Sequence, residues 1–279
     1  MEKTRQNQEE RYKIYSLPVD KELSASQNNL IPFINYHIAA PTRCLDMLLR
    51  KHNGENYQSE VVMRKYGEVP TATLQKTVNE STILLITDGG LVPLGNPDGI
   101  PSVGAETYGI YSILDKKRLS KDAYEVCHQG YDPTYIMENP NRLLPIDVLR
   151  TLEQEGEIGK LHDKFISTTG VMAPITASKK MGDDIANYII EHEIDAAIIV
   201  STCGTSTRCG AYMALALQKQ NIPVVQVANL IQIPESIGVK RIYRGTNIFS
   251  PFGDCDLSTI HEDKRRRVQI QEVIRILEE

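Results

Sequence analysis

The residues best suited to chemistry lie in one segment, Ser201 to Gly210, with the sequence STCGTSTRCG. An apolar run that predicts a buried strand precedes it, and a run typical of a helix follows it. We therefore expect Cys203 at the carboxyl end of the strand, in a loop that faces a helix N-terminus. Free N–H groups and the positive end of the helix dipole favour a thiolate there, and Arg208 adds a fixed positive charge. Since the thiolate is the reactive form of cysteine, the pattern predicts that Cys203 is a redox-active nucleophile.

A second cysteine, Cys209, follows Cys203 by six positions. This spacing is too long for a CxxC redox motif, but a folded loop would bring the two sulfurs together for a resolving disulfide. The small residues Thr205 and Ser206 would let a substrate approach the backbone closely. The alternative is that Cys203 is a small buried side chain in a tight turn, although the strand end, the polar loop and the second cysteine favour chemistry. No metal site is predicted, because the spacing does not suit metal ligands and no histidine is near.

Four residues elsewhere are candidates to position a substrate or to move protons. Asp88 follows a second buried strand, and it reaches the same cleft if the two strands are parallel. His128 offers an acid or base, Tyr131 offers a donor to an oxyanion or carboxylate, and Asp132 lies beside them in the sequence. Each has a structural alternative, because Asp88 suits a turn, and His128 and Asp132 suit the capping of backbone groups. The residues alone leave these alternatives open.

Strands and helices alternate in the second half of the chain, with short connections. Such alternation predicts an α/β fold of Rossmann-like, doubly wound parallel sheets, with the active site at the carboxyl ends of the strands. Uninterrupted apolar runs predict buried strands, and apolar residues at helical spacing predict helices. The predicted strands are residues 81–87, 164–168, 195–201 and 223–228. One predicted helix starts at Pro145, and three others cover residues 178–191, 209–220 and 260–277.

The remaining segments have less regular patterns. Residues 30–39 are typical of a strand, and the residues from Thr42 to Lys51 have helical spacing. Residues 105–143 are dense in Tyr, Gly, Pro and Asn, and they predict an irregular insertion. The predicted domains are an N-terminal arm at residues 1–29 and an α/β region at residues 30–279, with sub-domains at about 30–160 and 161–279.

The composition of the 279 residues is that of a globular protein, with 41% hydrophobic and 24% charged residues. The net charge of −5 argues against a nucleic-acid-binding protein, and the basic run from Lys264 to Arg267 is interpreted as a solvated helix face. No apolar run reaches the ~20 residues that span a bilayer. The first residues, Met1 to Glu22, lack the apolar core of a secretory signal. We therefore expect a cytoplasmic protein without a membrane or nucleic-acid partner, whose five cysteines stay reduced.

Three segments resemble the selenoprotein B component of the glycine, sarcosine, betaine and D-proline reductases. They are STCGTSTRCGA at 201–211, ITDGGLVPLGNPD at 86–98 and HQGYDPTYIMENPNRLLPIDVLRTLEQEGEIGKL at 128–161, within a resemblance that runs from about residue 30 to residue 258. In that family a selenocysteine occupies position 203, and the usual glycine-reductase pattern has cysteines at positions 206 and 209. This chain has Cys203, Ser206 and Cys209. Cys203 is then either a true cysteine variant or a replacement for a native selenocysteine.

The resemblance implies a catalytic subunit of a thiol- or selenol-dependent reductase complex. Such an oxidoreductase cleaves a C–N or related bond of a small amine substrate such as glycine, sarcosine, betaine or proline. Cys203 would attack the substrate, and Cys209 would resolve the adduct as a disulfide that thioredoxin reopens. The other candidate residues would position the substrate or move protons. No cofactor is expected in this chain, and the implied partners are a pyruvoyl-containing subunit derived from a proprotein, a selenoprotein A-like acceptor and the thioredoxin system, in an oligomeric assembly.

Two other hypotheses follow from departures from the family pattern. The glycine, sarcosine and betaine forms carry a further N-terminal domain, so a partner is expected to supply part of the substrate site. Because Ser206 replaces a cysteine, the chain could instead be a non-catalytic scaffold or diverged subunit of such a complex. A thiol-based redox protein that acts on other small substrates is a further alternative. A racemase with two facing cysteines is disfavoured, because six-residue spacing on one loop does not give opposite faces of a substrate.

Overall fold

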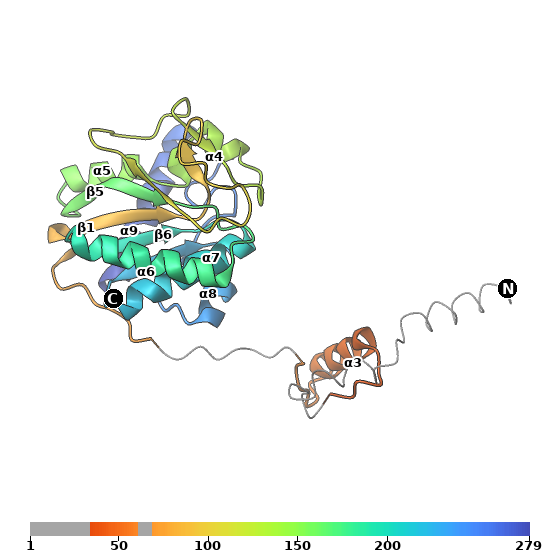
Figure 1. The fold of residues 1–279 in the computed structure, drawn as a ribbon. Helices are drawn as coiled ribbons and strands as arrows, with labels where there is room; N and C mark the ends of the chain where they lie inside the picture. The colour runs from red at the N-terminus through yellow and green to blue at the C-terminus, as the bar shows by residue number, and fades with distance from the viewer. Residues whose placement is uncertain (1–33, 61–68) are drawn as a thin grey trace. The chain divides into compact units, whose positions relative to one another are not determined.

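The computed structural model describes residues 34–60 and 69–279, which belong to two compact units divided after residue 64 (Figure 1). The first unit contains helix α3 (Ala40–His52), which confirms the helix predicted from apolar spacing. A proline in its first turn and three basic residues in its last turn suit the two ends of a helix. Its apolar face is exposed, because none of its residues is buried. The predicted N-terminal arm, residues 1–29, lies outside the described residues.

The strand predicted at residues 30–39 is wrong for the part that the structure describes. Residues 34–39 form a turn, in which the Asn35 side chain accepts a hydrogen bond from the His37 N–H at 3.1 Å. Asparagine side chains stabilise turns through such local contacts. A local polar contact therefore outweighs the apolar content of this stretch.

The second unit is built on one six-stranded sheet. Its strands are β1 (Thr82–Thr87), β3 (Gly109–Ser112), β5 (Lys160–Ser167), β6 (Ala196–Val200), β7 (Val224–Ala228) and β8 (Ile242–Arg244), in the order β3-β5-β1-β6-β7-β8. Five strands are parallel, which confirms the predicted parallel sheet, and β3 adds an antiparallel edge that the pattern did not predict. Numbered along the chain, the parallel strands run 2-1-3-4-5, so the winding direction reverses between β1 and β6.

Helices cover both faces of this sheet (Figure 1). They are α5 (Ile146–Gln154) and α9 (Thr259–Glu278) on one face, and α6 (Ile175–Glu191), α7 (Gly204–Lys219) and α8 (Gln232–Ile237) on the other. Along β1, Ile83 and Leu85 pack in the core beneath α5 and α9, whereas Leu84 and Ile86 pack in the core beneath α6 and α7. An uninterrupted apolar strand is the pattern that burial on both faces requires.

The segment between β1 and α5 contains the predicted irregular insertion, residues 105–143. Its elements are β2 (Leu91–Pro93) and β4 (Tyr124–Val126), which pair antiparallel, strand β3, helix α4 (Thr134–Glu138) and a 3-10 turn at Pro140–Arg142. After β4, the Cys127 N–H donates to the Gly90 carbonyl at 2.9 Å. This contact holds the loop that follows β4 at the carboxyl end of β1.

Most of the predicted boundaries agree with the structure to within a few residues, and α7 is the main exception. The helix was expected to start at Cys209, but it starts at Gly204. The Thr207 hydroxyl and the Thr207 N–H both donate to the Cys203 carbonyl, so helical hydrogen bonding runs through a stretch whose composition suggests a loop. The single sheet contains strands from both of the predicted sub-domains, about 30–160 and 161–279. The division into these sub-domains stays a prediction. None of the helices within residues 34–60 and 69–279 has the length and apolar character needed to cross a membrane.

Candidate functional site

The carboxyl ends of β1 and β6 lie side by side at the point where the winding of the sheet reverses. The Thr87 hydroxyl and the Asp88 N–H both donate to the Val200 carbonyl, at 2.8 and 3.3 Å. In open α/β sheets this reversal forms a crevice where ligands bind. The loops that carry Asp88 and Cys203 therefore meet at one edge of the sheet, as the sequence analysis expected.

Cys203 is the N-cap residue of α7, and 8% of its surface is exposed. Its sulfur lies 3.4 Å from Ser206 Oγ, 3.7 Å from Thr205 Oγ1 and 3.9 Å from His128 Nε2. The first N–H groups of a helix have no partner within the helix, and they form the positive end of its dipole. The Cys203 sulfur therefore lies at the positive end of the α7 dipole, within reach of two hydroxyl groups.

His128 reaches the same position from the loop after β4. The Gly130 N–H donates to His128 Nδ1 at 2.9 Å, so the ring proton lies on Nε2, which is 2.6 Å from Ser206 Oγ. Burial lowers the pKa of His128 from 6.5 to about 4. His128 is therefore neutral at pH 7 and donates its Nε2–H to Ser206.

Ser206 connects His128 with Cys203. When Cys203 is a thiol, its S–H donates to Ser206 Oγ; when it is a thiolate, the Ser206 hydroxyl can turn and donate to the sulfur. The three groups then form a chain in which His128 donates to Ser206 and Ser206 donates to Cys203. A neutral imidazole with its proton on Nε2 cannot take the proton of Cys203 along this chain. What it can do is stabilise negative charge on the sulfur.

Tyr131 holds this loop against the end of β1. Its hydroxyl donates to the Gly89 carbonyl at 2.8 Å, and its ring packs against the His128 ring with centroids 4.7 Å apart. Burial raises the pKa of Tyr131 well above its ordinary value, so the hydroxyl stays protonated. Tyr131 is thus a hydrogen-bond donor, and its acceptor in this structure is the protein backbone.

Asp88 is fully buried beneath the first turns of α7. Its carboxyl group accepts hydrogen bonds from the Ser201 hydroxyl at 2.5 Å and from the Thr202 N–H at 3.3 Å. Gln226 from β7 donates to the same Ser201 hydroxyl at 2.9 Å. Burial raises the pKa of Asp88 well above its ordinary value, although these hydrogen bonds act in the opposite direction. Asp88 therefore anchors the two residues that precede Cys203.

Two glycines allow the loops to approach so closely. A Cβ atom on Gly130 would lie 2.7 Å from His128 Cε1 and 3.1 Å from the Cys203 sulfur. A Cβ atom on Gly170 would lie 2.7 Å from Ser206 Cα and 3.0 Å from Asp88 Cβ. Any side chain at either position would displace a part of the site.

Arg208 and Asp132 do not contact the Cys203 sulfur. Arg208 Nη2 donates to the Ala173 carbonyl at 2.9 Å and so fixes the segment after β5. Asp132 is exposed and accepts from the Thr134 N–H and hydroxyl, at 3.0 and 2.6 Å, which lowers the pKa of Asp132. These contacts match the alternative in which Asp132 caps local backbone. Thr205 lies closer to the site and also accepts from the Met172 N–H at 3.1 Å.

Cys209 is placed away from Cys203, in the second turn of α7. It is fully buried in the core that α7 shares with α6, and burial raises the pKa of Cys209 to about 12. Six residues along a helix span about 9 Å, whereas a disulfide needs Cα atoms within about 7 Å of each other. A direct bond between the two sulfurs would require α7 to unwind, so this placement does not favour the resolving role predicted for Cys209.

Three site residues were not predicted from the sequence, namely Ser201, Gln226 and Gly130. Gln226 carried a signal, because it is a polar side chain within the buried apolar strand β7. The others are small residues of a kind common in any loop. Among residues 34–60 and 69–279, no group of three or more His, Cys, Asp and Glu side chains is arranged to hold a metal ion.

Comparison with known proteins connects this geometry to one family. The family model described as glycine/sarcosine/betaine reductase selenoprotein B matches residues 26–202, which end directly before Cys203. No solved structure gives a significant match to the chain.

Several curated proteins are similar over most of this chain. The glycine reductase complex component B subunit gamma of Carboxydothermus hydrogenoformans is 40% identical over 84% of this chain and 54% of its own length. The sarcosine and betaine reductase complex component B subunits beta of Peptoclostridium acidaminophilum are each 37% identical, over 85% and 81% of this chain. This chain spans about half of the length of these relatives. Since the family model matches more than half of the chain, the chain belongs to the glycine/sarcosine/betaine reductase selenoprotein B family.

Proposed function

We propose that this chain is a component B-type catalytic subunit of an amino-acid or betaine reductase complex, with Cys203 as its nucleophile. The observation that carries the proposal is the position of the Cys203 sulfur. It lies at the N-terminus of α7, at the carboxyl ends of the neighbouring strands β1 and β6, and 3.4 Å from a serine hydroxyl that can stabilise its charge. The names of the relatives indicate the substrate class, which is glycine, sarcosine or betaine.

In the proposed step the Cys203 thiolate attacks the carbon that carries the amine. The S–C bond forms as the C–N bond breaks, and the amine leaves with the electron pair of the broken bond and takes up a proton. The hydrogen bond from Ser206 holds the thiolate before attack, and His128 holds Ser206 in place. Because His128 is neutral and donates through Nε2, we assign it a positioning role rather than that of a base.

The reductive half of the cycle then needs a second thiol or selenol. Cys209 is buried with a pKa of about 12 and lies away from the Cys203 sulfur, so it is poorly suited to that role. We propose that a thiol or selenol of a selenoprotein A-like acceptor attacks the carbon of the adduct. Its bond to carbon forms as the S–C bond breaks, and Cys203 is regained as a thiolate. The thioredoxin system then supplies the electrons that return the acceptor to its reduced form. A pyruvoyl-containing subunit would hold the amine substrate during attack.

The test is amine release by the complex purified with its partner subunits. The complex is incubated with glycine, sarcosine or betaine in turn, together with a dithiol as reductant. We expect release with at least one substrate, loss of release in Cys203→Ser, and retention in Cys209→Ala. Cys255→Ser is the matched control, because that thiol lies in the same unit and outside the site. Equal release by the wild type and Cys203→Ser would overturn the proposal.

The alternative of a non-catalytic subunit has one specific observation in its favour, which is Ser206. The position three residues after Cys203 faces its sulfur, and a serine there cannot form a disulfide. Thiol labelling separates the two hypotheses. A catalytic Cys203 should react with iodoacetamide faster than the exposed Cys44, and a scaffold predicts the reverse order, because Cys203 is less exposed. Sequencing of codon 203 decides whether the native residue is selenocysteine.

A further inference from the structure

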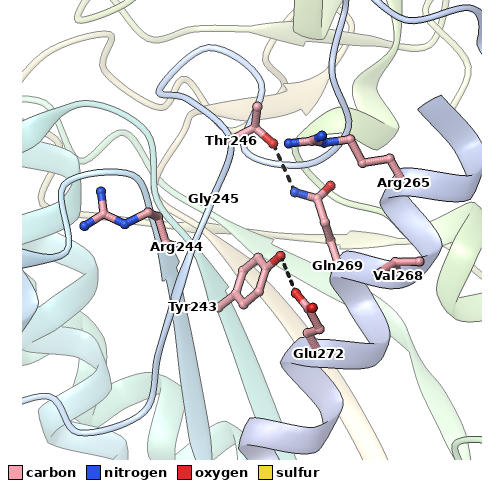
Figure 2. A pocket seen from close by; sticks show the side chains of 8 residues that line it. All are labelled: Tyr243, Arg244, Gly245, Thr246, Arg265, Val268, Gln269 and Glu272. Atoms are coloured by element: carbon pink, nitrogen blue, oxygen red, sulfur yellow. Dashed lines mark hydrogen bonds between the residues drawn. The ribbon is translucent and has the colours of Figure 1, made fainter. Parts of the chain in front are cut away.

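A cavity of 570 Å³ lies between the carboxyl end of β8 and helix α9, in a part of the molecule that the proposed reaction does not use (Figure 2). Its lining residues are Tyr243, Arg244, Gly245, Thr246, Arg265, Val268, Gln269 and Glu272. In the sheet, β8 is separated by β7 from β6, the strand that leads to Cys203. The cavity and the Cys203 site both lie at the carboxyl ends of parallel strands. Two strand spacings of about 4.8 Å separate β8 from β6, so the cavity and the Cys203 site are distinct.

The cavity is lined by two arginines without an acidic partner among the described residues. Arg265 forms no hydrogen bond or ion pair there, and Arg244 makes one long contact, 3.5 Å, to the Asn229 carbonyl. The next two residues of the same basic run differ. Arg266 pairs with Asp147 and Asp263, and Arg267 pairs with Glu155 and Glu157. Of the run interpreted as a solvated face, Lys264 and Arg265 are exposed as expected, whereas Arg266 is buried against its acidic partners; Arg265 also lines the cavity.

The wall around these arginines is held by neutral hydrogen bonds. Gln269 Nε2 donates to Thr246 Oγ1 at 3.0 Å, and Gln269 Oε1 accepts from the Gly253 N–H at 2.6 Å. Glu272, which is the one acidic residue that lines this cavity, accepts from the Tyr243 hydroxyl at 2.9 Å. The Arg244 side chain points away from α9, so Arg265 supplies the guanidinium group that faces the cavity, and it forms no ion pair with Glu272.

We propose that this cavity binds a small organic anion, whose phosphate or carboxylate group contacts Arg265. Figure 2 shows Arg265 extending from α9 towards Thr246, whereas the Arg244 side chain extends from β8 to the opposite side, away from α9. A guanidinium group offers paired donors that match the oxygens of either anion. The Val268 side chain and the Tyr243 ring supply apolar surface for a carbon skeleton. The volume is within the range of about 300 to 1,000 Å³ that is usual for small-molecule sites.

Isothermal titration calorimetry of the full chain at low ionic strength tests this proposal, with glycerol phosphate and succinate as probes. We expect saturable binding of at least one probe and an affinity loss of about tenfold or more in Arg265→Gln, because a hydrogen bond to a charged group is lost. Glu272→Gln should bind the same probe more tightly, since it removes a negative charge while the side chain still accepts from Tyr243. Binding of only glycerol phosphate would assign a phosphorylated ligand, and binding of only succinate would assign a carboxylated one.

Arg275→Gln is the matched control, because Arg275 is exposed on the same helix and does not line the cavity. We expect it to leave the affinity unchanged. An equal loss of affinity in Arg275→Gln and Arg265→Gln would mean general attraction by charge and would overturn the proposal, as would the absence of saturable binding for both probes. Iodoacetamide labelling of Cys203 should be the same in Arg265→Gln and the wild type, so this test is independent of the proposed reaction.

Discussion

At the scale of single residues, the site depends on which groups donate hydrogen bonds and which accept them. The Gly130 N–H fixes the proton of His128 on Nε2, and this assigns Ser206 as the group that links the imidazole to the Cys203 sulfur. One backbone N–H thus decides the role of a histidine whose type alone suggests an acid or base.

The disulfide geometry of α7 can be tested by Ser206→Cys. Because Ser206 Oγ lies 3.4 Å from the Cys203 sulfur, a small shift brings two sulfurs to the bonding distance of about 2.05 Å. We expect mild oxidation of this variant to remove two free thiols, counted with Ellman's reagent. The wild type, with Cys209 as the second cysteine of the helix, should keep all its thiols, as should the double variant Cys203→Ser/Ser206→Cys. A Cys203–Cys209 disulfide in the wild type would contradict this geometry.

The lowered pKa of His128 predicts a dependence of stability on pH. The folded value is about 4 and the ordinary value is 6.5, so the unfolded chain binds a proton first as the pH falls. The stability due to neutral His128 is complete above pH 6.5 and is lost between pH 6.5 and about 4, up to about 3 kcal/mol. Urea unfolding across this range should show a shallower loss in His128→Gln. Identical pH profiles for both proteins would show that His128 titrates normally.

At the scale of elements, α7 decides the arrangement of the site. Its N-terminus presents Cys203, and its second turn lies directly over the carboxyl group of Asp88. A Cβ atom on Gly210 would lie 2.5 Å from Ser201 Oγ and closer still to Asp88. The glycine is therefore required by packing, although glycine costs about 1 kcal/mol relative to alanine inside a helix.

Substitution of the two glycines of α7 separates these effects. Gly210→Ala should destabilise the protein by about 2 kcal/mol or more, because the clash with Asp88 and Ser201 exceeds the gain in helix propensity. Gly204→Ala is the control, since its Cβ atom would meet Leu230 and Ile233 at 3.5 and 3.6 Å, which is ordinary contact. We expect a change within about 0.5 kcal/mol for this variant. The measurement is the free energy of unfolding in urea, and a stable Gly210→Ala would refute the packing argument.

The elements also show how far the sequence predicts this structure. Buried parallel strands such as β6 and β7 follow from their apolar runs, and Cys203 follows from its place between a strand and a helix. The short strands β3, β4 and β8 do not follow, because their three or four residues carry no periodic signal and form only through tertiary pairing. The start of α7 was missed because Gly, Thr and Ser disfavour helices on their own.

At the scale of the whole molecule, ion pairs join segments that are far apart in the chain. Arg142, after α4, makes two hydrogen bonds to Glu262 of α9, at 2.6 and 3.1 Å, with both side chains buried. Arg266 makes an equivalent pair with Asp147 of α5 at 2.7 and 2.8 Å. These contacts fasten the last helix to the insertion and to α5.

Removal of one partner from the buried pair tests this connection. Glu262→Gln should destabilise the protein by about 3 kcal/mol, because the guanidinium of Arg142 stays buried with one fewer countercharge. Glu278→Gln, at an exposed position near the end of the same helix, should have almost no effect. Thermal unfolding followed by circular dichroism measures both. Equal melting temperatures for the two variants would mean that the pair does not stabilise the fold.

The pairing of β1 with β6 also has a consequence for synthesis of the protein. The contacts that close the crevice, such as Thr87 to Val200, join residues 113 positions apart. Until β6 has left the ribosome, the central apolar strand β1 has no partner along the edge that β6 later covers. Non-local pairing of this kind is slow, and an open apolar edge attracts other chains. Nascent chains that stop before residue 196 should therefore aggregate, because they lack the strand that closes this edge.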